Sequence, residues 1–194
     1  MNRTLRWTLS FAIAFGVAVP AAAQAPSKEE VKKRLLVMMS GFEKVPSPEE
    51  WKAAGPPELV AQALVEVADD VSMAPSRRAR AVTGLRYAPV PAAATALERI
   101  AKDEKSLPML RRKAVLGLGS VSQAASLPVL EGLLSSPDPL FRDAVLQGIA
   151  EVATPEAVKM VEARLAIEKS ESVRKTMERL LPEMKARLKA MPSS

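Results

Sequence analysis

The residues of this sequence that could support acid–base chemistry are adjacent carboxylates. Three such pairs are Glu49–Glu50, Asp69–Asp70 and Asp103–Glu104. Two carboxylates act as general acid and base only if both face one reacting group. Residues adjacent in a helix point away from each other, and all three pairs lie near expected helix ends, where solvated acids are common. The pairs therefore do not indicate a catalytic site.

Nucleophilic and metal-dependent chemistry also lack their usual residues. The 194-residue sequence contains no histidine and no cysteine, which excludes a histidine-based triad and a conventional zinc or copper site. Ser120 and Ser122 therefore have no histidine to activate them, and a serine–lysine pair stays open without any spacing that places one. No glycine-rich phosphate loop occurs. We expect no enzyme activity, no catalytic residue, no metal and no cofactor.

The N-terminus has the three parts of a secretory signal. Two arginines precede an apolar run at Trp7–Val19, and Pro20 and three alanines follow it. We expect residues 1–23 to be cleaved, so that a periplasmic or secreted protein begins at Gln24. The alternative is an uncleaved anchor, but the run is short for a bilayer span and Pro20 interrupts it.

Charge and the absence of cysteine limit the partners and the means of stabilisation. Cleavage would remove two arginines and no acid, lowering the net charge from +6 to +4. This mild excess, in an exported protein, does not favour a nucleic-acid partner. Without cysteine there are no disulfides, so stability has to come from packing.

From residue 57 onward the sequence repeats with a period of 31 to 33 residues. One arginine marks the second helix of each unit: Arg78, Arg111, Arg142 and Arg174. Apolar residues stand three and seven positions after each marker. In the first three units a glycine follows by six positions and a proline precedes by three. Repetition at this period predicts stacked helical hairpins, and no segment alternates like a strand, so the predicted fold class is all-α.

A helical leader precedes the repeats. Ser27 with Glu30 and Ser47 with Glu50 have the spacing of capping boxes, each predicting a helix start. The first helix is expected to present one apolar face, formed by Val31, Leu35, Met38 and Phe42. We interpret residues 27–55 as a cover for the open end of the first repeat.

Two segments carry a resemblance to a known family: Asp138–Arg142 and Leu110–Gly119. Their pattern resembles the second helix of the HEAT repeat, including the short bacterial form named after the phycobilisome lyases. The resemblance covers roughly residues 57–181. It implies a short right-handed α-solenoid of about four hairpins behind an N-terminal helical leader. The expected division is a signal peptide at 1–23, a linker with capping helices at 24–56, and a repeat domain at 57–194.

The resemblance also implies a role for the marker arginines. In that family the recurring arginine usually ties neighbouring repeats together through an acid or a carbonyl near the turn between helices. Asp70 and Asp103 stand eight residues before their arginines and are the implied partners, with Asp138 in the third unit. The alternative is that the four arginines form an anion-binding ladder.

The second helices of HEAT repeats line a concave surface, which suggests where a partner binds. The off-core positions of the first two second helices are basic: Arg77, Arg80, Arg86, Arg112 and Lys113. Asp143, Gln147 and Glu151 occupy the corresponding stretch of the third. We hypothesise that an acidic segment of a protein, or an anionic envelope polymer, binds the basic stretch. The alternative is an ordinary solvated helix face.

Together these features predict a non-catalytic, exported scaffold that mediates protein–protein interaction through its concave face. The alternative is an accessory or regulatory subunit of an exported enzyme or envelope complex. Other helical solenoids process DNA bases or attach bilins. Export argues against the first of these activities, and only the family name suggests the second. The sequence does not indicate an oligomeric state.

Overall fold

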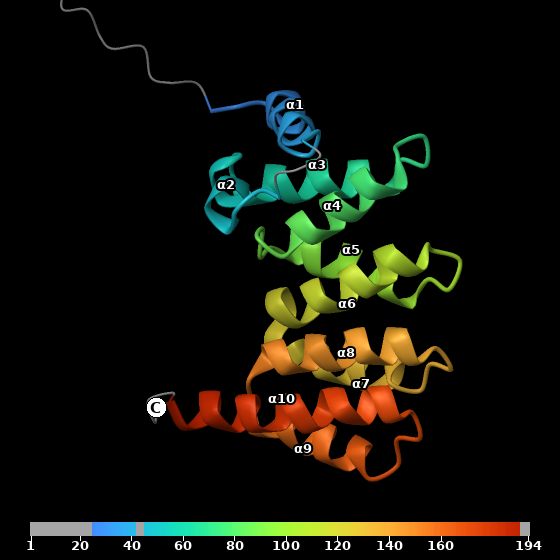
Figure 1. Cartoon of the computed structure of the whole chain (residues 1–194). Helices are drawn as coiled ribbons and strands as arrows, with labels where there is room; N and C mark the ends of the chain where they lie inside the picture. The colour runs from blue at the N-terminus through green and yellow to red at the C-terminus, as the bar shows by residue number, and fades with distance from the viewer. Residues whose placement is uncertain (1–24, 42–44, 191–194) are drawn as a thin grey trace, which may run out of the picture.

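The computed structural model describes residues 25–41 and 45–190, which are all-α and contain no strand. Helices follow one another along the chain and stack in order from the leader to the C-terminus (Figure 1). Their bounds are α1 Lys28–Met38, α2 Pro48–Ala53, α3 Pro57–Asp69, α4 Pro75–Leu85, α5 Pro91–Lys102, α6 Pro108–Ser122, the 3₁₀ helix η1 Gln123–Ser126, α7 Leu127–Leu133, α8 Pro139–Val152, α9 Pro155–Leu165 and α10 Glu171–Ala190.

Most helix starts follow from local chemistry. Proline is the first residue of α2 to α6, α8 and α9, where its missing amide proton costs no hydrogen bond. Both predicted capping boxes are confirmed: Ser27 and Glu30 satisfy each other's backbone amides, and so do Ser47 and Glu50. The Asp138 carboxylate accepts from the Leu140 amide at 2.9 Å and caps α8.

Within the described residues the solenoid consists of four hairpins, formed by α3–α4, α5–α6, α7–α8 and α9–α10. The second helices α4, α6, α8 and α10 pack against one another down the stack, and the first helices approach each other less closely (Figure 1). The second helices therefore form the more closely packed side of the stack.

The repeat register sets the core. The residues three positions after each marker arginine are fully buried: Ala81, Ala114, Val145 and Met177. Those seven positions after it are also buried: Leu85, Leu118, Ile149 and Leu181. The sequence interpretation of these positions as inward-facing is confirmed.

Two glycines bring the second and third units into backbone contact. A Cβ atom added at Gly119 of α6 would lie 2.0 Å from the Gly148 carbonyl oxygen of α8. One added at Gly148 would lie 2.5 Å from the Val115 carbonyl oxygen. Only residues without a Cβ allow α6 and α8 to approach so closely.

The third unit departs from the regular pattern. Helix α6 continues to Ser122, and Gln123 then takes a positive φ of 45° before η1 and the short α7. The first helix of this unit is therefore one 3₁₀ turn followed by seven α-helical residues.

The leader packs on the first hairpin. Lys28 and Lys32 of α1 both donate to the Glu66 carboxylate of α3, at 2.6 and 2.7 Å. Val31 and Leu35 are fully buried as predicted, but Met39 is buried where Met38 was expected, and Met38 is only half-buried. Met39, the C-cap of α1, keeps a right-handed helical conformation and stands four residues after Leu35, so it continues the face formed by Val31 and Leu35. Phe42 lies outside the described residues.

Among the helices of residues 25–41 and 45–190, none is both long enough and apolar enough to cross a membrane. The predicted signal, residues 1–23, lies outside the described residues.

Candidate functional site

The first two marker arginines bind carbonyls, not acids. Arg78 donates from Nε to the Ala68 carbonyl at 2.8 Å, and Arg111 donates in the same way to Ala101 at 3.1 Å. Each accepting carbonyl lies ten residues earlier, in the first helix of the same hairpin. These two hydrogen bonds therefore close a hairpin and do not join neighbouring repeats.

The acids implied as partners of the marker arginines are bonded to other groups. Asp70 accepts from the amide and hydroxyl of Ser72, and these hydrogen bonds lower the pKa of its carboxyl. Asp103 accepts from the Ser106 hydroxyl and the Lys105 amide, which lower its pKa likewise. Neither aspartate bonds to its arginine, and Asp138 is a helix cap, so the pairing with these three acids was wrong. The physical reason is that each carboxylate is already hydrogen-bonded to groups two or three residues further along its own turn.

Arg142 does join two repeats, through a residue that the sequence reasoning missed. It donates to both carboxylate oxygens of Glu168 at 3.0 and 2.6 Å, and Glu168 lies in the turn between α9 and α10 of the next unit. Arg164 also donates to Glu168, at 2.7 Å. The Glu168 side chain is only 1% exposed. Hydrogen bonds from Arg142 outweigh the burial and lower the pKa of Glu168 to about 2.

The remaining marker contacts vary from unit to unit. The Arg111 guanidinium lies 4.2 Å from the centre of the Phe141 ring in the next unit, a cation–π contact between repeats. Arg174 at the C-terminal end is exposed, and no hydrogen bond of its side chain occurs within the described chain. Because the four arginines have different partners, they do not form one anion-binding ladder.

The five candidate partner-binding residues do not form one patch. Arg80 donates to the backbone carbonyls of Met39 and Gly41, at 2.7 and 2.5 Å, and so ties the leader to α4. Arg86 donates to the Ser120 hydroxyl at 2.9 Å and lies 3.5 Å from the Glu151 carboxylate. The guanidinium of Arg77 contacts the Met73 sulfur at 3.8 Å. Arg80 and Arg86 are therefore structural contacts between elements, which corrects the expectation for these two.

Arg112 and Lys113 remain as a candidate site, at a groove between α6 and α8. Within the described residues neither side chain has an ion-pair or hydrogen-bond partner, and Lys113 is exposed. The groove encloses about 440 Å³. Its walls combine basic and apolar side chains from the two second helices: Met109, Arg112, Lys113, Leu116, Leu140, Asp143, Ala144 and Gln147.

The composition of this groove is unusual for a solvated helix face. Leu140 is 67% exposed and Met109 38% exposed, next to the two unpaired cations. The one carboxylate in the wall, Asp143, accepts hydrogen bonds from Gln147 and from Thr176 of α10. The groove therefore presents apolar surface and positive charge together. The apolar contribution was missed because the sequence pattern separates core from surface but does not show which surface residues meet.

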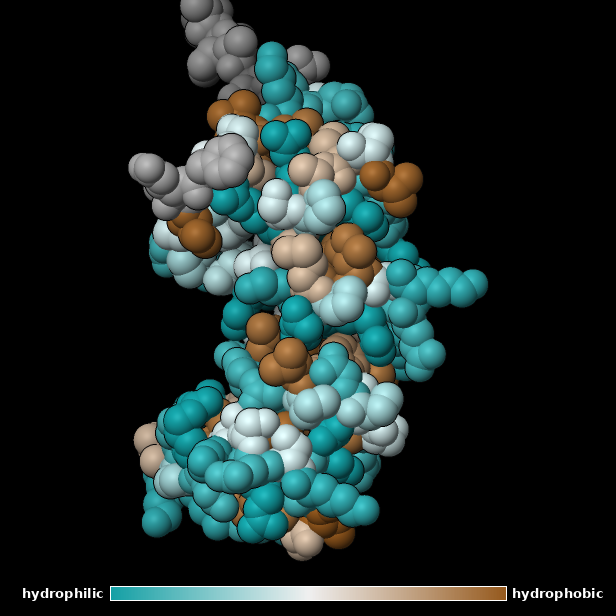
Figure 2. All heavy atoms as spheres, turned by 45° about the vertical axis from the view of Figure 1, so that its right-hand side comes forward, coloured by the Kyte–Doolittle hydropathy of each residue, from teal (hydrophilic) through white to brown (hydrophobic). Residues whose placement is uncertain are grey.

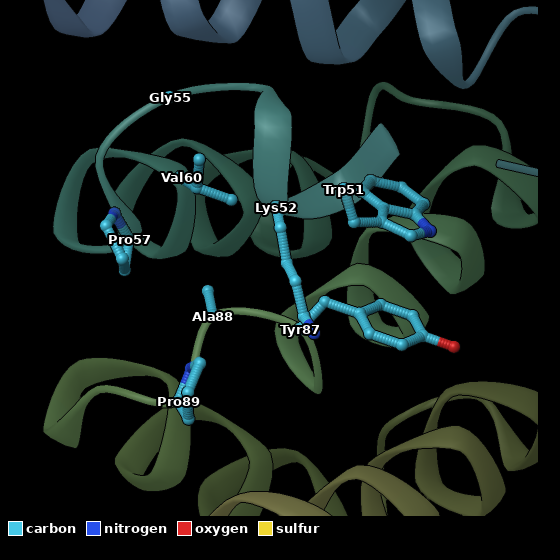
Figure 3. A pocket seen from close by; sticks show the side chains of 8 residues that line it. All are labelled: Trp51, Lys52, Gly55, Pro57, Val60, Tyr87, Ala88 and Pro89. Atoms are coloured by element: carbon cyan, nitrogen blue, oxygen red, sulfur yellow. The ribbon is translucent and has the colours of Figure 1, made fainter. Parts of the chain in front are cut away.

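A second hollow lies between the leader and the first hairpin, with a volume of about 230 Å³ (Figure 3). Trp51, 1% exposed, and Tyr87 stand beside it with nearly parallel rings, 6.4 Å between centres and 9° between planes. The complete wall is Trp51, Lys52, Gly55, Pro57, Val60, Tyr87, Ala88 and Pro89. Apart from Lys52, these side chains are apolar or aromatic.

The two carboxylates of the Asp69–Asp70 pair are engaged in separate contacts. Asp69 pairs with Arg99 at 2.7 Å, whereas its neighbour Asp70 closes the loop at Ser72. Over the described part of the chain, no group of three or more acidic residues could hold a metal ion. On the face drawn in Figure 2, apolar residues form separate groups among hydrophilic ones, so that face has local sites and not one broad apolar interface.

Comparison with known proteins identifies the class. A model of HEAT repeats matches residues 106–182, and the hairpins before that segment repeat the same architecture. Residues 106–182 therefore match the HEAT-repeat family, and the described chain has the fold of a HEAT solenoid. No curated protein matches the chain by sequence.

One solved structure shares the fold. A chain from the complex of CpcE and CpcF of phycocyanin lyase from Nostoc sp. PCC7120 is similar with a TM-score of 0.56 and 18% identity, over 79% of this chain and 99% of that chain. An engineered protein is similar with a TM-score of 0.43 and 18% identity, over 81% of this chain and 80% of that chain. At 18% identity the CpcE–CpcF relationship shows the fold alone.

Proposed function

We propose that this protein is an exported, non-catalytic scaffold that binds an acidic, partly apolar segment of a partner protein on its concave side. The observation that carries the proposal is the groove between α6 and α8, where Arg112 and Lys113 have no partner among the described residues and stand beside exposed Leu140. An unpaired cation next to exposed apolar surface favours a partner that supplies both a carboxylate and an apolar side chain. The solved complex of CpcE and CpcF, whose chain has a similar fold, supports a protein partner.

The position of the groove supports the same proposal. Solenoids bind extended partners along the surface lined by their second helices, and α6 and α8 are the middle two of this stack. A partner segment lying there would reach both neighbouring units. Binding of this kind also suits an accessory subunit of an exported enzyme or envelope complex, which is the second candidate function.

The experiment is to capture partners from the envelope fraction, identify them, and measure the affinity of the purified pair. We expect Arg112→Glu/Lys113→Glu to lower the affinity at least tenfold and to reduce its dependence on salt, because exposed charges are screened over about 8 Å at physiological ionic strength. Arg80 is unsuitable for this reversal since its guanidinium holds the leader.

The matched control is Lys33→Glu/Lys159→Glu. It makes the same charge change on α1 and α9, at two exposed lysines outside the groove. Circular dichroism checks that both variants are folded. Equal affinity of the groove variant and the control for the identified partner would contradict the proposed groove.

Export has its own test. The first residues carry the pattern of a cleaved signal, and we expect the intact mass of the protein from the envelope fraction to correspond to a chain that begins at Gln24. A mass that retains residues 1–23 in the membrane fraction would favour the anchor.

A further inference from the structure

The hollow beside Trp51 is a formed pocket on a different part of the molecule from the α6–α8 groove. It lies where α2 and the turn after it meet α3 and the turn between α4 and α5 (Figure 3). Tyr87 comes from that last turn and Trp51 from α2. Three separate segments therefore have to fold together before the pocket exists.

Its walls are held in place by the surrounding core. A Cβ atom added at Gly84 would lie 2.7 Å from the Trp51 ring, so the indole sits directly against the α4 backbone. Trp51 also stacks near Tyr87. The Arg86 guanidinium lies 5.6 Å from the centre of the Tyr87 ring. A site whose aromatic walls are fixed before binding loses little conformational freedom when a ligand enters.

Volume limits the ligand. The pocket of about 230 Å³ exceeds an apolar cavity of roughly 150 Å³ that accepts benzene, and is smaller than the roughly 300–1,000 Å³ of pockets for drug-sized ligands. A single ring or a short branched chain fits this volume. A nucleotide, a polycyclic ligand or an extended cofactor does not.

The charge of the pocket wall further limits which ligands can bind. Lys52 is the one charged side chain of the wall, and its stem extends from α2 toward Tyr87 in the close-up (Figure 3). Lys52 is exposed and has no ion-pair partner within the described part of the chain. Hydrogen bonds from its own backbone amide and from Ser47 are the main causes that lower the pKa of Glu49, one turn earlier in α2; Lys52 contributes less, and the two side chains form no ion pair. A ligand carboxylate could thus pair with Lys52 while its apolar body enters the pocket.

From the size, the carbon walls and the single cation, we infer that this pocket binds a small monocarboxylate with an apolar body of one ring or one branched chain. The inference does not depend on the proposed scaffold function. The pocket and the α6–α8 groove share no lining residue, so each can fail without the other.

Ligand binding in this pocket can be measured through the fluorescence of Trp51. The sequence has two tryptophans, Trp7 and Trp51, so the full chain carrying Trp7→Phe reports indole fluorescence from the pocket wall alone. Cyclohexanecarboxylate is a suitable probe because it has one ring, one carboxylate and no absorbance that overlaps the indole. We expect a saturable fluorescence change, with an affinity up to about fivefold higher than for neutral cyclohexanecarboxamide.

Two variants locate the binding. Lys52→Gln is expected to reduce the affinity for the acid about fivefold and to leave the affinity for the amide unchanged, since an exposed ion pair contributes up to about that factor. Tyr87→Ala should reduce the affinity for both probes about tenfold by removing an aromatic wall. Lys33→Gln, at an exposed lysine of α1, is the control and should bind both probes like the parent.

Each possible result of these binding measurements either supports or contradicts the inference. A saturable signal that prefers the acid and depends on Lys52 but not on Lys33 supports the inference. Equal affinities for acid and amide, equal effects of the two lysine changes, or no saturable signal in the parent would each overturn it. Lys52 is exposed, so Lys52→Gln is expected to fold, and the test does not rely on Tyr87→Ala alone.

Discussion

The two junctions on either side of α8 are built in different ways. Between the second and third units, Gly119 and Gly148 bring two helix backbones into contact, and a Cβ atom at Gly119 would lie 2.0 Å from a carbonyl oxygen. Between the third and fourth units, Arg142 and Arg164 surround the buried carboxylate of Glu168. The first junction depends on shape and the second on charge. The comparison shows that repeats of one architecture can be joined in two ways. The first junction is sensitive to residue size, and the second is sensitive to pH.

The largest effect is expected from placing a charge in the first junction. Leu118 is 2% exposed in α6, next to Gly119. Leu118→Asp would bury an unpaired carboxylate, at a cost of several kcal/mol that is comparable to the whole stability of a small domain. We expect loss of the cooperative thermal transition, measured by circular dichroism. Arg112→Ala, on the same helix but half-buried at the groove, should shift the transition only slightly, and equal shifts for both would contradict the register.

A smaller change tests shape directly. Gly119→Ala adds one methyl group where α8 backbone stands in its way, so α6 and α8 have to separate, and we expect destabilisation of about 3 kcal/mol in denaturant unfolding. The control is Gly132→Ala in α7, where an added Cβ meets nothing within 4 Å. That control should be neutral or stabilise by up to about 1 kcal/mol, because alanine favours helix over glycine. Similar losses in both variants would mean that glycine serves helix geometry and not close approach.

The second junction is expected to respond to pH. The pKa of Glu168 is lowered to about 2 in the folded protein from an ordinary 4.5, so its ionised form stabilises the fold above pH 4.5. That contribution is lost as the pH falls toward 2, and amounts to about 2 kcal/mol between pH 7 and pH 3. The free energy of unfolding should therefore fall less between these pH values in Glu168→Gln than in the parent. The difference between the two isolates Glu168 from Glu66, Asp70 and Asp103, whose pKa values are also lowered. Parallel pH profiles would contradict the role of this carboxylate.

The smallest effect concerns Asp138, which begins the helix shared by both junctions. Its carboxylate caps α8 and is not bonded to Arg142, so Asp138→Ala should cost about 1 kcal/mol. Asp138→Asn keeps the capping oxygen and should unfold like the parent. If the asparagine variant loses as much as the alanine variant, charge and not capping would explain the effect of Asp138.

Much of the fold could be predicted because helix boundaries depend on nearby residues. A cap is a hydrogen bond across two or three positions, so Ser27 with Glu30 was sufficient to predict the start of α1. The buried positions after each marker arginine follow in the same way from the helical period. At the end of α1 the predicted inward residue was wrong, because Met39 is buried in place of Met38.

The sites were predicted less well because they depend on which helices meet. Glu168 is 26 residues from Arg142, and no local spacing connects them. Arg80 and Arg86 have the composition of a basic surface, yet both bind groups from other elements of the stack. Of the five proposed basic residues, Arg112 and Lys113 stand at an apolar groove and have no charged partner within the part of the chain that the structure describes.

The sequence by itself therefore determined the all-α class, the repeat period, the helix starts and the inward positions, all of which depend on interactions over a few residues. The tertiary structure alone decided which contacts of the marker arginines close a hairpin and which join two repeats. It also decided that Trp51 and Tyr87 share a pocket, although they are 36 residues apart in the sequence. The physical reason is that side-chain partners across helices are set by how closely and at what angle the helices pack. At Gly119 and Gly148 that approach depends on atoms from two repeats at once.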